Sequence, residues 1–199
     1  MSTSESEIMV LETTQGPVKI KMRPDLAPQH VARISELVRS GFYDGIVFHR
    51  VIEGFMAQTG CPHGTGTGGS GVKLKAEFNT EPHVRGTASM ARAQNPDSGD
   101  SQFFICFDDA RFLDRQYTVW GQVISGMENV DKIKRGEPVR DPDKIVRAYM
   151  EETAQAHPVA DEGDEAGSDE KPAKKPAAKK APAKAKTGTK KAATSKKKS

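Results

Sequence analysis

The stretch FHRVIEGFMAQ, residues 48–58, contains an arginine whose place in the fold decides how the sequence is interpreted. Two runs rich in β-branched and aromatic residues flank Glu53-Gly54, a pattern typical of two short strands joined by a turn. Arg50 lies inside the first run. An arginine there either faces water on the polar side of a sheet or is a fixed cation beside an apolar pocket, and this stretch by itself leaves both interpretations open.

Further strand-like runs surround this stretch. Residues 8–22 alternate between apolar and polar and break at Gln15-Gly16-Pro17, which predicts a β-hairpin. The other runs are short and are separated by glycine, proline, asparagine and aspartate; they are residues 46–52, 55–60, 87–93, 102–107, 118–124 and 144–150.

Two segments have helical spacing instead. One begins at Pro28 and ends at Gly41, and a shorter one begins near Met127 and ends at Gly136. Many short strands with two helices argue against alternating βαβ units, and they favour a closed or sandwiched antiparallel sheet.

The C-terminal part has a different composition. Residues 161–199 contain no Val, Ile, Leu, Met, Phe, Tyr, Trp or Cys, so this segment cannot bury enough apolar surface to offset the entropy of ordering it. We therefore predict a flexible N-terminus (1–7), a globular domain (8–157) and a disordered tail (158–199) that is first acidic and then lysine-rich.

Charge is divided unevenly between these parts. The tail holds 12 of the 30 basic residues and 6 of the 27 acidic ones, so the domain is mildly acidic although the chain carries +3. Its Lys/Ala/Pro composition resembles the tails of linker histones and of some bacterial nucleoid proteins. Such a tail could bind nucleic acid or another polyanion through counterion release, and the alternative is a solvated tail without a partner. The acidic block of residues 161–170 could fold back on the lysines and weaken that contact.

The N-terminal residues and the two cysteines indicate the cellular compartment. Residues 1–7 have neither the basic nor the apolar stretch of a signal peptide, and no run approaches the ~18 apolar residues of a membrane helix. Cys61 and Cys106 lie in apolar contexts and are interpreted as small core residues rather than a disulfide or metal ligands. We expect a cytoplasmic protein without membrane contact.

Alternation along the strands predicts a mixed surface. Three strands each place a polar residue beside a large apolar one on the same face: Phe48 with Arg50, Met56 with Gln58, and Gln102 with Phe104. This mixture suits a groove with an apolar pocket and a few placed donors, and the alternative is that the polar groups face water.

Other kinds of chemistry find little support. Ser89 and Ser101 lack the glycines of a nucleophile elbow, and the five histidines are not spaced like a metal pair. The glycine-rich loop of residues 60–71 matches neither phosphate-binding motif, so we interpret it as a compact loop beside a groove.

Several long motifs resemble the cyclophilin family of peptidyl-prolyl isomerases. They are FHRVIEGFMAQTG (48–60), GTGG (66–69), ASMARA (88–93), DSQFFICF (100–107) and FLDRQYTVWGQVISGM (112–127). The likeness runs from about Ile8 to Met150, and Tyr117 together with the short domain resembles the bacterial cytoplasmic branch. It implies a mainly β fold, a closed eight-stranded antiparallel β-barrel capped by two α-helices, with a substrate groove on its outer face and no cofactor or metal.

The resemblance also implies roles for individual residues. Arg50 matches the catalytic arginine. Phe55, Met56, Phe104 and Leu113 match the pocket for the proline ring, and Gln58 and Gln102 match groups that hold the peptide backbone and position the arginine. Ala91, Arg92 and Ala93 match a segment whose backbone hydrogen-bonds the residues that precede the substrate proline. Gly66 matches a residue at the groove edge.

Three positions depart from the best-known members of the family. Phe112 replaces a tryptophan that helps to bind cyclosporin, so we predict weakened inhibition. Tyr117 replaces a groove histidine, which should change substrate preference more than chemistry. Arg92 replaces an asparagine and is expected to add a positive charge at the rim and little else.

The expected function is isomerisation of X–Pro bonds in proline-containing peptides and unfolded proteins, by a monomer that assists protein folding. The alternative is a non-catalytic module or chaperone that binds proline peptides and is recruited to nucleic acid by its tail. Retention of Arg50 together with Phe55, Met56, Gln58 and Gln102 favours activity, because a binding module could have lost them.

Overall fold

The structure is a computed structural model that describes residues 7–151 of the chain. The predicted tail, its acidic block and the domain boundary at residue 157 lie outside the described residues, and so does almost all of the predicted N-terminal segment. Those divisions therefore stay predictions.

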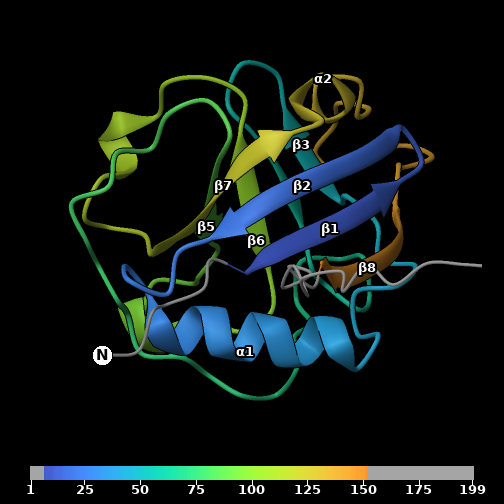
Figure 1. The fold of residues 1–199 in the computed structure, drawn as a ribbon. Helices are drawn as coiled ribbons and strands as arrows, with labels where there is room; N and C mark the ends of the chain where they lie inside the picture. The colour runs from blue at the N-terminus through green and yellow to red at the C-terminus, as the bar shows by residue number, and fades with distance from the viewer. Residues whose placement is uncertain (1–6, 152–199) are drawn as a thin grey trace, which may run out of the picture. The chain divides into compact units, whose positions relative to one another are not determined.

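Eight strands form one antiparallel sheet (Figure 1). They are β1 (Ile8–Thr13), β2 (Gly16–Met22), β3 (Arg50–Ile52), β4 (Met56–Thr59), β5 (Thr87–Met90), β6 (Phe103–Cys106), β7 (Val119–Ser125) and β8 (Ile145–Glu151). Their order across the sheet is β3-β4-β6-β5-β7-β2-β1-β8. Two short 3₁₀ turns, Pro96–Ser98 and Arg111–Leu113, lie in the connections on either side of β6.

The sheet is curled but not continuously closed. Its two end strands, β3 and β8, share no ladder within the described residues. Instead, an isolated bridge joins Val47 to Lys144, and Phe48 N donates to Asp143 O at 2.8 Å. The mainly β, eight-stranded antiparallel fold with two helices is confirmed, whereas the predicted closed barrel was too strong a description of this half-barrel.

Two helices lie at opposite ends of the curled sheet in Figure 1. The helix α1 (Pro28–Arg39) begins with proline at its first turn and buries Val31, Ile34, Leu37 and Val38, as its spacing predicts. The helix α2 (Met127–Val130) is a single turn, shorter than the predicted 127–136. Beyond it the α-helical pattern is lost: the backbone N–H groups of Lys132 and Ile133 donate to carbonyls three residues back, and that of Lys134 donates to the Asp143 carboxylate at 2.9 Å.

The sheet buries apolar side chains on both faces. In β6, Phe103 and Ile105 point into the main core, while Phe104 and Cys106 belong to a second, smaller cluster on the outer face. Met56 from β4 joins that outer cluster, with Ala110 and Leu113 from the connection after β6. The outer cluster is therefore a patch of apolar packing against which a site can form.

One predicted face is wrong. Phe48 is buried in the main core and does not share the outer face with Arg50. Regular strand geometry begins only at Arg50, because residues 47 and 48 pair with the segment before β8. Strict alternation therefore does not extend back from Arg50 to Phe48.

Candidate active site

A pocket of about 380 Å³ opens on the outer face of the sheet, above the outer cluster. We call it the apolar pocket. It is lined by His49, Arg50, Phe55, Met56, Gln58, Thr65, Gly66, Ala91, Arg92, Phe104, Leu113 and Tyr117. Ten of these twelve residues were singled out from the sequence, so the structure brings most of the candidate site together in one place.

The floor of the apolar pocket consists of buried apolar side chains. Phe104 and Met56 are 5% and 2% exposed, and the edge of Phe104 meets Tyr117 at 5.7 Å between ring centroids. Beneath it, Phe104 stacks on the buried His83 at 6.2 Å. Such a floor fits the ring of a small apolar residue and keeps water away from it.

Arg50 reaches this pocket because of strand register. Arg50 is the cross-strand partner of Gln58, and Gln58 is the partner of Phe104, so all three side chains lie on the outer face. Arg50 Nη1 donates to Gln58 Oε1 at 3.4 Å. The register answers the opening question, because the arginine borders the apolar pocket instead of facing only water.

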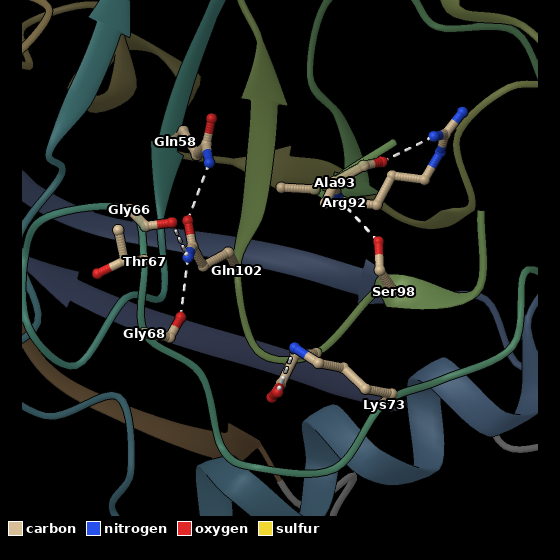
Figure 2. A pocket seen from close by; sticks show the side chains of 11 residues that line it. Gln58, Gly66, Thr67, Gly68, Lys73, Arg92, Ala93, Ser98 and Gln102 are labelled. Atoms are coloured by element: carbon tan, nitrogen blue, oxygen red, sulfur yellow. Dashed lines mark hydrogen bonds and ion pairs between the residues drawn. The ribbon is translucent and has the colours of Figure 1, made fainter. Parts of the chain in front are cut away.

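Gln58 and Gln102 form a hydrogen-bonded relay (Figure 2), and the Gln58 end of this relay accepts from Arg50. Gln102 Nε2 donates to the carbonyls of Gly66 and Gly68 at 2.9 and 2.8 Å, which fixes the orientation of its amide. Its Oε1 then accepts from Gln58 Nε2 at 3.0 Å, and this leaves Gln58 Oε1 turned toward Arg50. The glycine-rich loop thus orients the guanidinium through two amides.

A second pocket of about 330 Å³ adjoins the first across Gln58, Gly66, Ala91 and Arg92. Figure 2 looks into it; its further lining residues are Thr67, Gly68, Lys73, Ala93, Ser98, Asp100 and Gln102. The predicted groove-edge loop therefore does form one wall. None of Thr67, Gly68, Lys73, Ser98 and Asp100 was predicted, because they come from loops without strand or helix periodicity.

Asp100 ties this wall to the rest of the domain. It accepts hydrogen bonds from Ser70 N and Oγ, each at 2.6 Å, and an ion pair from Lys73 at 3.2 Å. Burial by itself would raise the pKa of Asp100, but these donors outweigh burial and hold the pKa below its usual range. The carboxylate stays charged and keeps the loop in place.

Arg92 does more than add charge to the rim. Its Nε donates to Gln116 O at 2.9 Å, its Nη1 donates to Ala93 O at 2.9 Å, and its guanidinium lies 4.8 Å from the centre of the Tyr117 ring. The expectation that Arg92 contributes only a positive charge was therefore incomplete, because the side chain braces one wall of the apolar pocket.

Some candidates lie at the edge of the site. Ala93 and Gln102 line the second pocket and not the first. Phe112 lines neither pocket; it is 67% exposed and packs its ring against Phe55 at 5.5 Å. Phe112 therefore extends the apolar surface outward from the pocket mouth.

His49 lines the wall of the apolar pocket, although strict alternation with Arg50 would place it on the opposite face of the strand. It is 6% exposed, and neither ring nitrogen has a hydrogen-bond partner among the described residues. Burial, and then the neighbouring charge of Arg50, lower its pKa, so the imidazole is neutral beside the cation. Its place could have been found only by knowing that the backbone before Arg50 is irregular.

Cys61 and Cys106 are both free and buried, and Cys106 belongs to the outer cluster. Within residues 7–151, no three His, Cys, Asp or Glu side chains gather in the way a metal site requires. No helix in this part of the chain has both the length and the apolar composition needed to cross a bilayer.

Comparison with known proteins agrees with this geometry. Residues 8–152 match the family model described as cyclophilin type peptidyl-prolyl cis-trans isomerase. The chain belongs to this family. The predicted resemblance, its extent and the enzyme class, peptidyl-prolyl cis-trans isomerase, are confirmed.

Individual relatives are similar over most of the domain. A probable peptidyl-prolyl cis-trans isomerase of Brucella suis is 54% identical over 160 residues, covering 72% of this chain and 82% of the relative. Peptidyl-prolyl cis-trans isomerase B of Bacillus subtilis is 44% identical over 126 residues, 62% of this chain and 87% of the relative. Both names denote the same enzyme class.

Solved cyclophilin structures share the fold. AquaCyp293 from Hirschia baltica has a TM-score of 0.67 and 34% identity, and the alignment covers 72% of this chain and 73% of that one. A Cryptosporidium parvum cyclophilin, solved in the presence of the dipeptide Ala-Pro, has a TM-score of 0.68 and 28% identity over 72% and 98% of the two chains.

Proposed function

We propose that this isomerase accelerates rotation about X–Pro bonds by placing the Arg50 guanidinium beside the imide nitrogen of a proline seated in the apolar pocket. One observation carries the proposal: Arg50 borders a pocket floored by Met56 and Phe104 and is hydrogen-bonded to the Gln58–Gln102 relay. A fixed cation and an apolar slot share one surface.

The chemistry follows from the peptide bond. Rotation is slow because the nitrogen lone pair is shared with the carbonyl, which gives a barrier of ~18–20 kcal/mol. In the twisted state the nitrogen is pyramidal and its lone pair is localised. A donor that meets this lone pair stabilises the twisted state more than the planar one, which is the requirement for catalysis. Arginine suits the task because it stays protonated at every physiological pH.

The remaining residues support that donor. The proline ring enters between Phe55, Met56, Phe104 and Leu113, where water is excluded and a hydrogen bond from Arg50 is strengthened. Gln58 and Gln102 hold the guanidinium, and Ala91 to Ala93 with Gly66 line the path of the residues that precede proline. No proton is transferred and no covalent bond forms, so the mechanism needs no nucleophile.

A protease-free assay tests the proposal. Exchange between the cis and trans forms of an X–Pro peptide, followed by NMR, should be fast with the wild-type enzyme, and Arg50→Ala should lower kcat/KM at least about tenfold, equivalent to ~1.4 kcal/mol of transition-state stabilisation. Circular dichroism checks that the variant is folded. Wild-type turnover by Arg50→Ala would remove the arginine from the mechanism, and an inactive wild-type protein would favour the alternative of a pure binding module.

We infer that the substrates are proline-containing segments of unfolded proteins and that the enzyme assists folding in the cytoplasm. The pocket is open at the surface and has an apolar floor of Met56 and Phe104, which fits a proline ring in an extended chain. The related Cryptosporidium protein was solved in the presence of Ala-Pro, the smallest segment of this kind.

We also propose that the lysine-rich tail binds nucleic acid or another polyanion. The proposal rests on composition: 12 lysines and no large apolar side chain in residues 161–199. A gel-shift comparison of the full chain with one truncated after Pro158 tests it, over a range of salt concentrations. Binding by the full chain that weakens steeply with salt is expected, whereas equal binding by both proteins would reject the idea.

A further inference from the structure

Arg50 has a second polar partner that no sequence motif indicates. Its Nε donates to the Glu137 carboxylate at 2.7 Å. Glu137 comes from the connection between α2 and β8, and no residue of that connection lines either pocket. The pair is partly open to solvent, with side chains 40% and 58% exposed. Exposed ion pairs of this kind contribute little by themselves, so a functional role for this one requires that the structure hold Glu137 opposite Arg50.

The backbone around Glu137 meets this requirement. Val51 and Gly136 exchange two hydrogen bonds of 2.8 Å, and Val139 N donates to His49 O at 3.2 Å. These bonds involve the residues on both sides of Arg50, so residues 136–139 run alongside the start of β3 and set Glu137 opposite Arg50.

The close turn at Gly136 holds this segment in shape. A Cβ at Gly136 would lie 2.8 Å from both Pro138 O and Val139 Cα, which is closer than a side chain tolerates. The glycine allows the segment to double back immediately after its bonds to Val51. The backbone of this segment therefore sets where Glu137 lies relative to Arg50.

The two partners of Arg50 divide its donors. Nε donates to Glu137 and Nη1 donates to Gln58, while Nη2 donates to no group among the described residues. Hydrogen bonds at two nitrogens orient the planar guanidinium, so the N–H groups that remain on Nη1 and Nη2 are oriented with it. Arg50 lines the apolar pocket.

We propose that Glu137 is a positioning residue for the isomerisation: its carboxylate fixes the Arg50 guanidinium so that a free N–H group of the guanidinium meets the nitrogen of the twisted imide. This inference rests on the proposed role of Arg50. Glu137 acts through geometry, although its negative charge also offsets part of the positive charge of the arginine. Loss of the hydrogen bond should therefore lower kcat, whereas loss of the negative charge by itself should not. Variants that remove one or both separate the two effects.

Three variants carry the test, with kcat and KM measured separately on an X–Pro peptide. Glu137→Ala should lower kcat about threefold to fivefold, the range expected from an exposed pair worth up to ~1 kcal/mol, with little change in KM. Glu137→Gln retains an oxygen that accepts from Nε and should recover most of the rate. Asp141→Asn removes the same charge from the same connection, where Asp141 pairs with Lys134, and should leave the rate unchanged.

Two further measurements separate this inference from the function it rests on. In an Arg50→Ala background, Glu137→Ala should have no additional effect on kcat. The Arg50 Nε–H signal in the NMR spectrum should exchange faster with water in Glu137→Ala than in the wild-type enzyme, which tests whether the carboxylate holds this nitrogen in solution.

The outcomes are distinct. Unchanged or increased kcat in Glu137→Ala, or a Gln variant as slow as the Ala variant, would overturn the positioning role while a slow Arg50→Ala variant left the proposed function standing. A fully active Arg50→Ala variant would instead overturn the proposed function and this inference with it.

Discussion

Phe104 and its two neighbours in β6 lie on opposite faces of the sheet, and only the face of Phe104 forms the site. Its neighbours Phe103 and Ile105 belong to the main core, while Phe104 turns outward, packs between His83 and Tyr117, and floors the apolar pocket. Because alternation puts Gln58 and Arg50 on the same face, an apolar floor and a cation become neighbours without any loop to join them.

Phe104→Ala should therefore weaken substrate binding and stability together. Removing a ring that is 5% exposed should cost roughly 3 kcal/mol of folding free energy and raise KM severalfold, since the proline ring loses its floor. Urea denaturation and peptide titration measure the two effects. Phe104→Leu is the matched control, because it restores most of the apolar volume and should recover stability more fully than KM. An unchanged KM in a folded Phe104→Ala variant would remove this residue from the binding site.

At the level of strands and loops, the site depends on close approach between the end of β4 and the residues before β6. Gly60 has φ +94°, and a Cβ there would lie 2.8 Å from Gln102 Cα. Gln102 is the residue that passes the orientation of the glycine-rich loop to Gln58. Residue 60 therefore cannot carry a side chain if Gln102 is to keep its place in the relay to Arg50.

Gly60→Ala should destabilise the protein by at least about 2 kcal/mol and lower kcat, since the backbone must move away from Gln102. Gly45→Ala is the matched control: Gly45 has φ +79°, but a Cβ there would meet nothing within 4 Å, so only the backbone strain remains. The difference between the two variants in urea denaturation isolates the steric part. Equal stability of both would show that the close approach has no importance.

What the sequence could predict follows the regularity of these elements. Periodic strands and long motifs indicated Arg50, Gln58 and Phe104 on one face, and the structure has them there. Periodicity failed where backbone bonds replace ladders, as at Phe48 and His49. Glu137 could not be foreseen, because its place depends on long-range pairing of a connecting segment with β3. The curl of the sheet likewise depends on how its two ends meet, which no local pattern encodes.

For the molecule as a whole, buried histidines make folding sensitive to acid. His30, His49 and His83 are each less than 10% exposed. Burial lowers the pKa of all three, and it outweighs the carboxylates of Glu77 and Asp114 that bond His30 and His83. The folded protein therefore keeps these rings neutral at a pH where the unfolded chain already protonates them.

Stability should consequently be greatest above pH 6.5 and fall as the pH drops below it, toward the lowered pKa values of the folded state. Each ring contributes a slope of up to about 1.4 kcal/mol per pH unit. A second loss should begin below about pH 3.8, where Asp100, Asp114 and Asp143 have lowered pKa values in the folded state. Urea midpoints between pH 7.5 and 5.0 test the first loss, which His83→Asn should make shallower; a midpoint that stays constant or rises on acidification would contradict it.

We propose that Arg50 stabilises the twisted imide and not merely the bound peptide. NMR line-shape analysis of an X–Pro peptide separates the dissociation constant from the exchange rate on the enzyme. In Arg50→Ala, we expect a dissociation constant within about threefold of wild type and an exchange rate at least about tenfold slower. An unchanged exchange rate, with the whole defect in the dissociation constant, would contradict it.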